Sequence, residues 1–388
     1  DGTRTDRAAQ GIDAVEVMEK VMQQKTSRIV YLDVLKGVSM LLVIYCHGVL
    51  LPYHSVVGNL MMTLAWGAVP CFVMASGAVL HQSRHFTWQK HGKRLGSMYM
   101  TLVCWRLLYL VVYRIAGKIT GISLWTCIKY LFFLQDYEGV DTGLMWYMIA
   151  YLGLMIVYPI TYFLFTGGTL GRQITFFIMI LSGLTGILFP SVNWLVGQII
   201  HGRELPLQAW NSILTFGNNN NLLFYFLLGA FLLEYQQGVD RKECGRIYRW
   251  RLPLSGICLV IGLMGLMFIK YRETGLLIWG DTYLSFGYVR LSTALIAIGL
   301  YGVCESLFSD RENLASKIIG EYIGQNTLGI YYLHYILLAV FSWTTCFSWL
   351  QFHYFIGMNL IKTFAVAFVC YVVVGLVSRV PLIRKMAS

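Results

Sequence analysis

The sequence predicts an all-α fold: a polytopic integral membrane protein of about ten transmembrane helices with both termini in the cytoplasm. Of the 388 residues, 57% are hydrophobic and only 13% are charged, and a soluble domain carries about twice that charged fraction. Solidly apolar runs recur along the chain, each close to the ~20 residues that a helix needs to cross the hydrocarbon layer. A β-barrel also satisfies its backbone in lipid, but its strands alternate apolar and polar residues, so the runs predict helices.

A charged segment at residues 1–27 precedes the predicted spans. Its apolar residues recur at helical spacing, which is typical of an amphipathic helix on the membrane surface, so we expect a cytoplasmic head there. Residues 28–388 are expected to form a single transmembrane domain, because no linker or internal repeat divides them. The ten spans are expected at 32–51, 59–80, 95–115, 144–165, 174–194, 222–236, 252–271, 284–305, 322–345 and 354–378.

The distribution of basic residues sets the predicted orientation. The net charge is +11, and Lys and Arg concentrate in alternate loops, above all in 237–251, as they do in cytoplasmic loops. These residues flank membrane spans, so they do not predict nucleic-acid binding. Residues 119–135 are apolar but contain Lys129, and counting them as a span would move loop 237–251 outside. We therefore predict an interfacial or re-entrant element on the outer face.

The nine cysteines are scattered through the chain. They show neither a CxxC pair nor the Cys/His spacing of a metal site, so we expect small buried side chains and no bound metal.

The first predicted span carries three ionisable side chains, Asp33, Lys36 and His47. Such groups are costly inside a membrane and usually face a cavity. The eleven residues from Lys36 to His47 correspond to about three helical turns, which places both side chains on one face, ~16 Å apart. Asp33 lies one turn before Lys36, within reach of an ion pair. The spacing leaves a plainer interpretation open, in which Asp33 and Lys36 anchor the helix at the interface and His47 makes a structural hydrogen bond.

The ninth predicted span adds a second histidine, His334. A single membrane histidine is typically a structural hydrogen-bonding residue, whereas two histidines at depth on different helices favour a proton-handling cavity. Trp146 and Tyr147, at the start of the fourth span, can line such a cavity or can belong to an aromatic belt at the membrane surface.

Four segments of the sequence form a set that resembles a known family. The first segment contains Asp33, Lys36 and Gly37, and His47 follows Lys36 after ten intervening residues. The other segments are Pro70 to Gly77, which ends in Ser-Gly, the basic start Lys93-Arg94-Leu95, and Gly324 to His334. In this order they resemble the motifs of membrane-bound acyltransferase family 3, although that family more often has Arg at the position of Lys36.

The resemblance implies an O-acyltransferase of the bacterial cytoplasmic membrane. Such an enzyme moves an acyl group, usually acetyl, from cytoplasmic acetyl-CoA to a hydroxyl of an envelope glycan or a lipid-linked sugar. The implied partners are the acyl-CoA donor, this acceptor and the surrounding lipids. Some members of the family carry a fused hydrolase-like domain that completes the transfer, and here we expect that role to fall to a separate extracytoplasmic transferase.

Each candidate residue has an expected role in that reaction. His47 is the expected general base or a transient acyl carrier, and His334 is a second proton carrier or a hydrogen-bonding contact of the acceptor. Asp33 is expected to orient Lys36 toward a phosphate or pantetheine group of the donor. The cations expected to hold the donor are Lys36, Lys93, Arg94, Arg249 and Arg251, and the residues expected to contact the acceptor are Trp146, Tyr147, Tyr331 and Asn326.

A transporter for a small polar solute, such as an amino acid, is the alternative from another functional class. Broken helices and intramembrane charge are typical of transporters as well. The sequence shows no evident paired halves with matching interrupted spans, and this argues against the alternative.

Overall fold

A computed structural model describes residues 28–48, 56–83, 86–119, 121, 123–200, 220–238, 245–275, 287–309, 312–343 and 356–377. Within these ranges every regular element is a helix and no strand occurs. The all-α fold class is therefore confirmed, while the predicted head at 1–27 lies outside the described residues.

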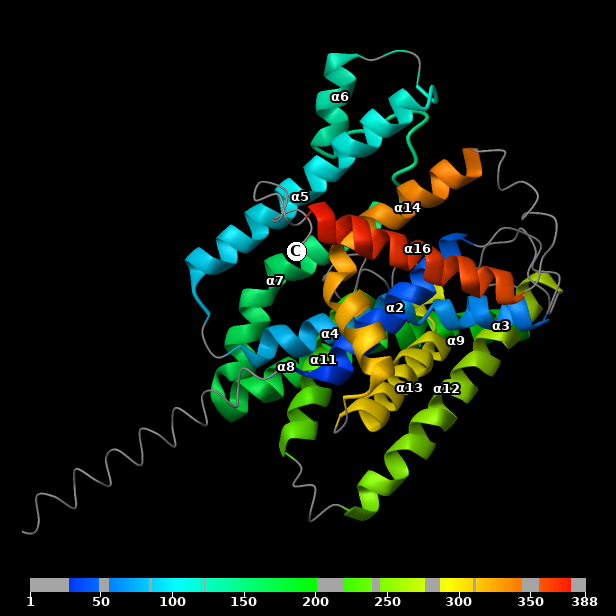
Figure 1. Cartoon of the computed structure of the whole chain (residues 1–388). Helices are drawn as coiled ribbons and strands as arrows, with labels where there is room; N and C mark the ends of the chain where they lie inside the picture. Colours follow the sequence, from blue (N-terminus) through cyan, green and yellow to red (C-terminus); the bar gives the residue numbers. More distant parts are fainter. Residues whose placement is uncertain are drawn as a thin grey trace, which may run out of the picture.

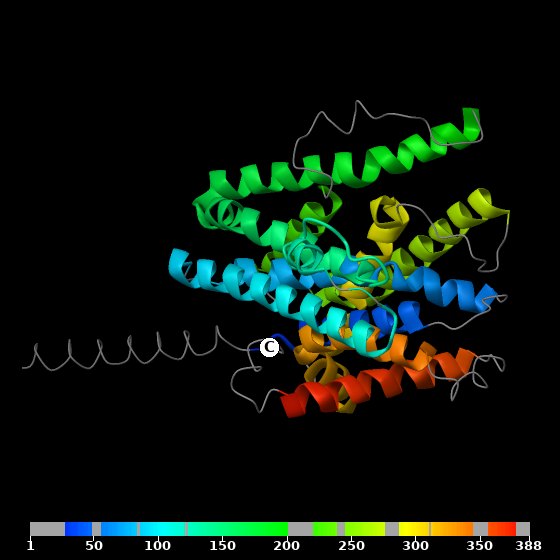
Figure 2. The same cartoon turned by 90° about the horizontal axis from the view of Figure 1, so that it is seen from above.

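Helix α2 (Val30–Gly48), which carries the ionisable stripe, lies in the centre of the bundle in both views (Figure 1, Figure 2). Several of its apolar side chains, among them Leu35, Met40 and Ile44, are completely buried. The elements packed around it are the π-helical segment Ser316–Ile323, α4 (Ala68–Gln82), α13 (Leu291–Phe308), α14 (Thr327–Trp343) and α16 (Ile356–Val377). Within this packing the polar residues Asp33 and Ser39 of α2 are buried between helices.

Eight helical segments of the described chain are long and apolar enough to cross a membrane. The protein is therefore a multi-pass membrane protein. The regions predicted as the sixth and ninth spans are helical too, as α11 (Asn220–Gly238) and as α14, of which 17 residues are described. The total of ten spans and the orientation stay predictions. The remaining long helices are α5 (Trp88–Ile115), α7 (Trp146–Thr166), α8 (Gly168–Gly183), α9 (Phe189–Ile200) and α12 (Gly245–Thr274).

Two of the predicted spans are interrupted where the sequence analysis expected continuous helices. The second span consists of α3 (Val56–Ala65) and α4, separated by a turn at Trp66 and Gly67. Pro70 lies in the first turn of α4 and has no N–H to continue the ladder from the preceding helix. In the fifth span a π-helical segment, Leu184–Leu188, links α8 to α9. It lies just before Pro190, which likewise lacks an N–H for the helical hydrogen bonds.

The element predicted at 119–135 contains the short helix α6 (Leu124–Leu131). Its eight residues span ~12 Å, too little to cross a bilayer. The following loop folds back on α5, where the buried guanidinium of Arg106 lies 4.0 Å from the Tyr130 ring centroid and 4.4 Å from that of Phe133. The element therefore packs against α5 as a short helix followed by a loop. Its placement on the outer face stays a prediction.

Cysteine labelling in intact cells tests the predicted orientation. In a background without reactive native cysteines, Gly238→Cys at the end of α11 should resist a membrane-impermeant maleimide, because it borders the basic loop that we predict to be cytoplasmic. Glu138→Cys in the exposed loop after α6 should be labelled. The opposite labelling pattern would reverse the orientation.

Candidate active site

The ionisable stripe of α2 faces one continuous stretch of chain that runs from Gln325 to Tyr335. Near the beginning of α2, Asp33 contacts Gln325, and at its end His47 contacts His334 and Tyr335. Helix α2 is unbroken between these two points, so the ~16 Å rise expected from the spacing holds in the folded chain. The structure thus confirms that both ends of the stripe share one face.

At the first of these ends, Asp33 is the centre of a charged cluster. Its Oδ1 pairs with Lys36 Nζ at 2.7 Å, and its Oδ2 pairs with Arg28 Nε at 2.8 Å. Gln325 Nε2 donates to the same Oδ2 at 3.2 Å. The second cation, Arg28, also lies 3.9 Å from Oε2 of Glu321, so the cluster holds two cations and two carboxylates. The half-buried Lys36 side chain is the cation of this cluster that the sequence analysis expects to meet the donor.

At the other end, His47 and His334 form a pair. Nδ1 of His47 lies 3.2 Å from Nε2 of His334, and the two rings stack with centroids 5.4 Å apart. His334 is completely buried, whereas His47 is exposed. The sequence predicted each histidine separately, and only the packing of α14 against α2 brings them together.

The surroundings of the pair fix its hydrogen-bonding direction. Nδ1 of His334 lies 3.1 Å from the carbonyl oxygen of Ile330, which can only accept, so this nitrogen carries the hydrogen. In the neutral ring Nε2 of His334 then accepts, and Nδ1 of His47 donates to it. This series of hydrogen bonds leaves Nε2 of His47 with a free lone pair, which is the form that a general base needs.

A carboxylate that the sequence analysis did not select completes this end of the site. Asp141, in the loop before α7, accepts a hydrogen bond from the hydroxyl of Tyr335, whose ring packs edge-on against His47 at 5.6 Å. Tyr335 thus links the Asp141 carboxylate to the His47 ring. Its sequence context, an aspartate two residues before a glycine, is that of an ordinary turn, so nothing in the pattern signalled it.

Three of the four residues expected to contact the acceptor lie along one aromatic row beside the histidines. The Tyr331 ring lies 6.0 Å from His334 and 5.7 Å from Tyr147, and Trp146 lies 6.2 Å from Tyr147. Tyr147 and Tyr331 are buried, so they line the interior and do not form a surface belt. Asn326 lies instead near the Asp33 cluster, next to Gln325, where its amide donates to the Tyr322 carbonyl at 3.0 Å.

The cations expected to hold the donor divide into two groups. Lys93 and Arg94 are exposed near the beginning of α5. Arg251, in contrast, pairs with Glu305 of α13 and lies over the Tyr235 ring, so its charge is already compensated within the bundle. The side chain of Arg249 lies outside the described residues. Across the described ranges, no three His, Cys, Asp or Glu side chains converge as metal ligands would.

Comparison with known proteins identifies the family. The acyltransferase-domain model of acyltransferase family 3 matches residues 29–381, a range that includes both ends of the α2 stripe, the histidine pair and the basic start of α5. No curated protein and no solved structure matches the chain. The chain therefore belongs to acyltransferase family 3, and it is a multi-pass membrane protein of that family.

Proposed function

We propose that the protein is an O-acyltransferase that moves an acyl group, in the first instance acetyl, from acyl-CoA to a hydroxyl of an extracytoplasmic glycan or lipid-linked sugar. The observation that carries the proposal is the arrangement along α2. An exposed base, His47, and a half-buried cation, Lys36, lie on one face of a helix, ~16 Å apart. That separation is comparable to an extended pantetheine arm, so the thioester of a donor held at Lys36 reaches His47.

The reaction follows from this geometry. Nε2 of His47 takes the proton of the acceptor hydroxyl, and the hydroxyl oxygen attacks the thioester carbonyl. The carbon–sulfur bond breaks, and the leaving coenzyme A thiolate takes the proton from the His47 imidazolium. His334 holds the His47 ring in its reactive tautomer through the hydrogen bond between the two rings. Asp141 stabilises the imidazolium that forms in between, since an opposite charge favours the charged state.

Thioester consumption tests this function against transport. Purified protein in lipid nanodiscs should release free thiol from acetyl-CoA when an envelope glycan acceptor is added, and the acetyl group should appear on the glycan by mass spectrometry. A transporter would consume no thioester, so solute uptake into proteoliposomes without thiol release would reject the proposal.

The donor cations give a graded prediction. Lys36→Met and the double variant Lys93→Ala/Arg94→Ala should each weaken donor binding by about tenfold or more, because charged hydrogen bonds contribute ~1.5–3 kcal/mol each. Lys36→Arg should bind nearly normally, and added salt should weaken binding to the unmodified protein. Lys129→Ala on α6 is the matched control. Unchanged coenzyme A affinity in both charge-removal variants would place the donor elsewhere.

Asp141 gives a prediction that separates catalysis from binding. Asp141→Asn keeps the shape of the side chain but removes the charge beside His47, so kcat should fall by about tenfold or more while donor affinity stays unchanged. Asp136→Asn is the matched control, because its carboxylate is 88% exposed and its 3.4 Å contact with Arg106 contributes little. Normal turnover by Asp141→Asn would show that the carboxylate only shapes the loop.

A further inference from the structure

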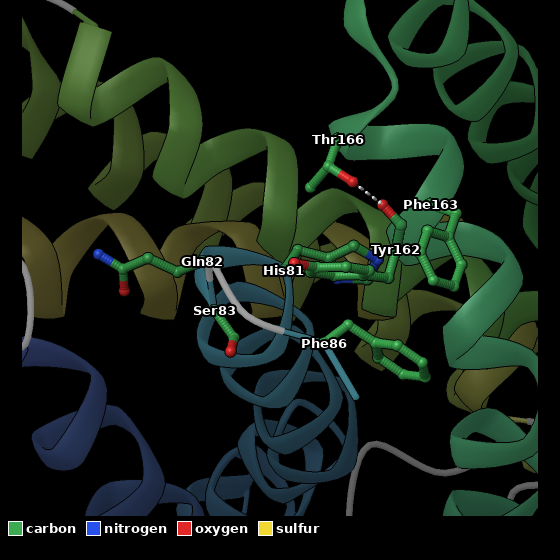
Figure 3. Close-up of a pocket in the computed structure, with 7 residues that line it drawn as sticks. All are labelled: His81, Gln82, Ser83, Phe86, Tyr162, Phe163 and Thr166. Atoms are coloured by element: carbon green, nitrogen blue, oxygen red, sulfur yellow. Dashed lines mark hydrogen bonds between the residues drawn. The ribbon is translucent and has the colours of Figure 1, made fainter. Parts of the chain in front are cut away.

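A pocket of about 500 Å³ lies where α4 ends, on the side of the bundle at which α2 begins. Its lining comes from the end of α4, from the loop that follows and from the end of α7 (Figure 3). In the close-up, Gln82 and Ser83 lie on one side, Phe86 and Phe163 on the other, and Thr166 above. Since α2 and the second span run in opposite directions, the pocket and Lys36 belong to the same predicted cytoplasmic side.

The pocket wall is aromatic. The Phe86 ring lies 5.4 Å from Tyr162, 5.1 Å from Phe163 and 5.1 Å from Trp88. Phe86 is half-buried and Phe163 is exposed, and both rings line the pocket. Amide and hydroxyl groups of Gln82, Ser83 and Thr166 lie around the same space. An aromatic wall with a polar rim is typical of a site for a flat heteroaromatic ring.

Cations lie beside this aromatic wall. Lys90, Lys93 and Arg94 are exposed on the first two turns of α5, directly after the pocket loop. His91, on the same first turns of α5, has its ring 5.4 Å from Phe86. Stacking rings and phosphate-binding cations are therefore adjacent, and that pairing matches a nucleotide, which carries both groups.

We propose that this pocket binds the adenine ring of the acyl-CoA donor, with Lys90, Lys93 and Arg94 on its phosphates. The inference rests on the proposed function and extends it by assigning the nucleotide end of the donor to Gln82, Ser83 and Phe86 and to the end of α7. A phospholipid headgroup offers the same phosphates but no ring to stack. The base is therefore the part of the ligand that the aromatic wall selects.

Binding of adenosine 3′,5′-bisphosphate, the nucleotide end of coenzyme A alone, tests the pocket directly. Protein in nanodiscs of zwitterionic lipid should bind this probe, and Phe86→Ala should weaken binding by about tenfold or more, since one base–aromatic stack contributes that much. Phe86→Leu keeps the apolar packing but removes the aromatic face, and it should also weaken binding. Phe163→Ala should weaken binding as well. Phe368→Ala, an exposed phenylalanine on α16, is the matched control and should bind normally.

The kinetic counterpart uses two donors. With acetyl-CoA, Phe86→Leu should raise KM with little change in kcat, whereas with acetyl-pantetheine, which lacks the nucleotide, Phe86→Leu and unmodified protein should behave alike. Equal affinity of Phe86→Leu, Phe163→Ala and unmodified protein for the bisphosphate would overturn the inference. The inference would also fail if anionic lipid vesicles displaced the probe as effectively as coenzyme A does. The cations alone would then account for binding.

These outcomes separate the inference from the proposed function. If the bisphosphate binds in the pocket but no thioester is consumed with any acceptor, the pocket assignment stands and the acyl transfer fails. If thiol is released normally by the Phe86 and Phe163 variants at low acetyl-CoA, the acyl transfer stands and the pocket assignment fails.

Discussion

His47→Gln is expected to reduce acyl transfer by about 10²- to 10⁴-fold, the contribution of a general base. Glutamine keeps hydrogen-bonding capacity at this position but cannot accept the proton of the acceptor hydroxyl near neutral pH. Donor binding should change little, because the Asp33–Lys36 cluster lies about three turns away on α2. Single-turnover transfer from radiolabelled acetyl-CoA, with coenzyme A affinity measured on the same preparation, gives both quantities.

The companion variant is His334→Gln. We expect a smaller loss of turnover, since His334 acts by holding the His47 ring, to which it is hydrogen bonded at 3.2 Å. Equal losses for the two variants would mean that His334 carries the proton as well. Near-normal turnover by His47→Gln would contradict the mechanism and leave this histidine with a structural role only.

Gly37→Ala is expected to destabilise the whole bundle. A β-carbon at this position would lie 2.0 Å from the carbonyl oxygen of Ile319, and that contact is with backbone, which cannot rotate away. A β-carbon added at Gly324 would likewise lie 2.0 Å from the carbonyl oxygen of Asp33. The two glycines let α2 and the segment around Ser316–Ile323 approach closely, as small residues do between membrane helices. To relieve the overlap the two elements must move apart, and this movement would break the hydrogen bond between Gln325 and Asp33.

The expected cost exceeds the ~1–3 kcal/mol typical of an overpacked core, because no side chain can adjust. Thermal unfolding of detergent-solubilised protein should show a large loss of Tm, together with loss of coenzyme A binding. Gly96→Ala on α5 is the matched control, since a methyl group added there would meet no atom within 4 Å beyond the backbone of its own helix, and it should be neutral or slightly stabilising. An unchanged Tm for Gly37→Ala would refute the close packing.

The candidate site shows where sequence reasoning succeeds and where it stops. Asp33, Lys36 and His47 share one helix, so helical periodicity alone predicted their common face and their separation. Asp141 and Tyr335 belong to a loop and to another helix, and no local spacing relates them to His47. Arg251 looked like a donor contact from its charge and its loop, but Glu305, 54 residues away in sequence, pairs with it.

The sequence by itself determined the all-α membrane class, the position of most spans and the polar stripe of α2. These depend on composition and on the repeat of a single helix, which are local properties. Only the tertiary structure decided that His334 lies against His47, that Asp141 lies beside them and that Phe86 and Phe163 enclose a pocket near the basic start of α5. Contacts between distant segments depend on which helices pack together. That choice is made by the close fit of the whole bundle, such as the approach of Gly37 to Ile319, which no single segment encodes.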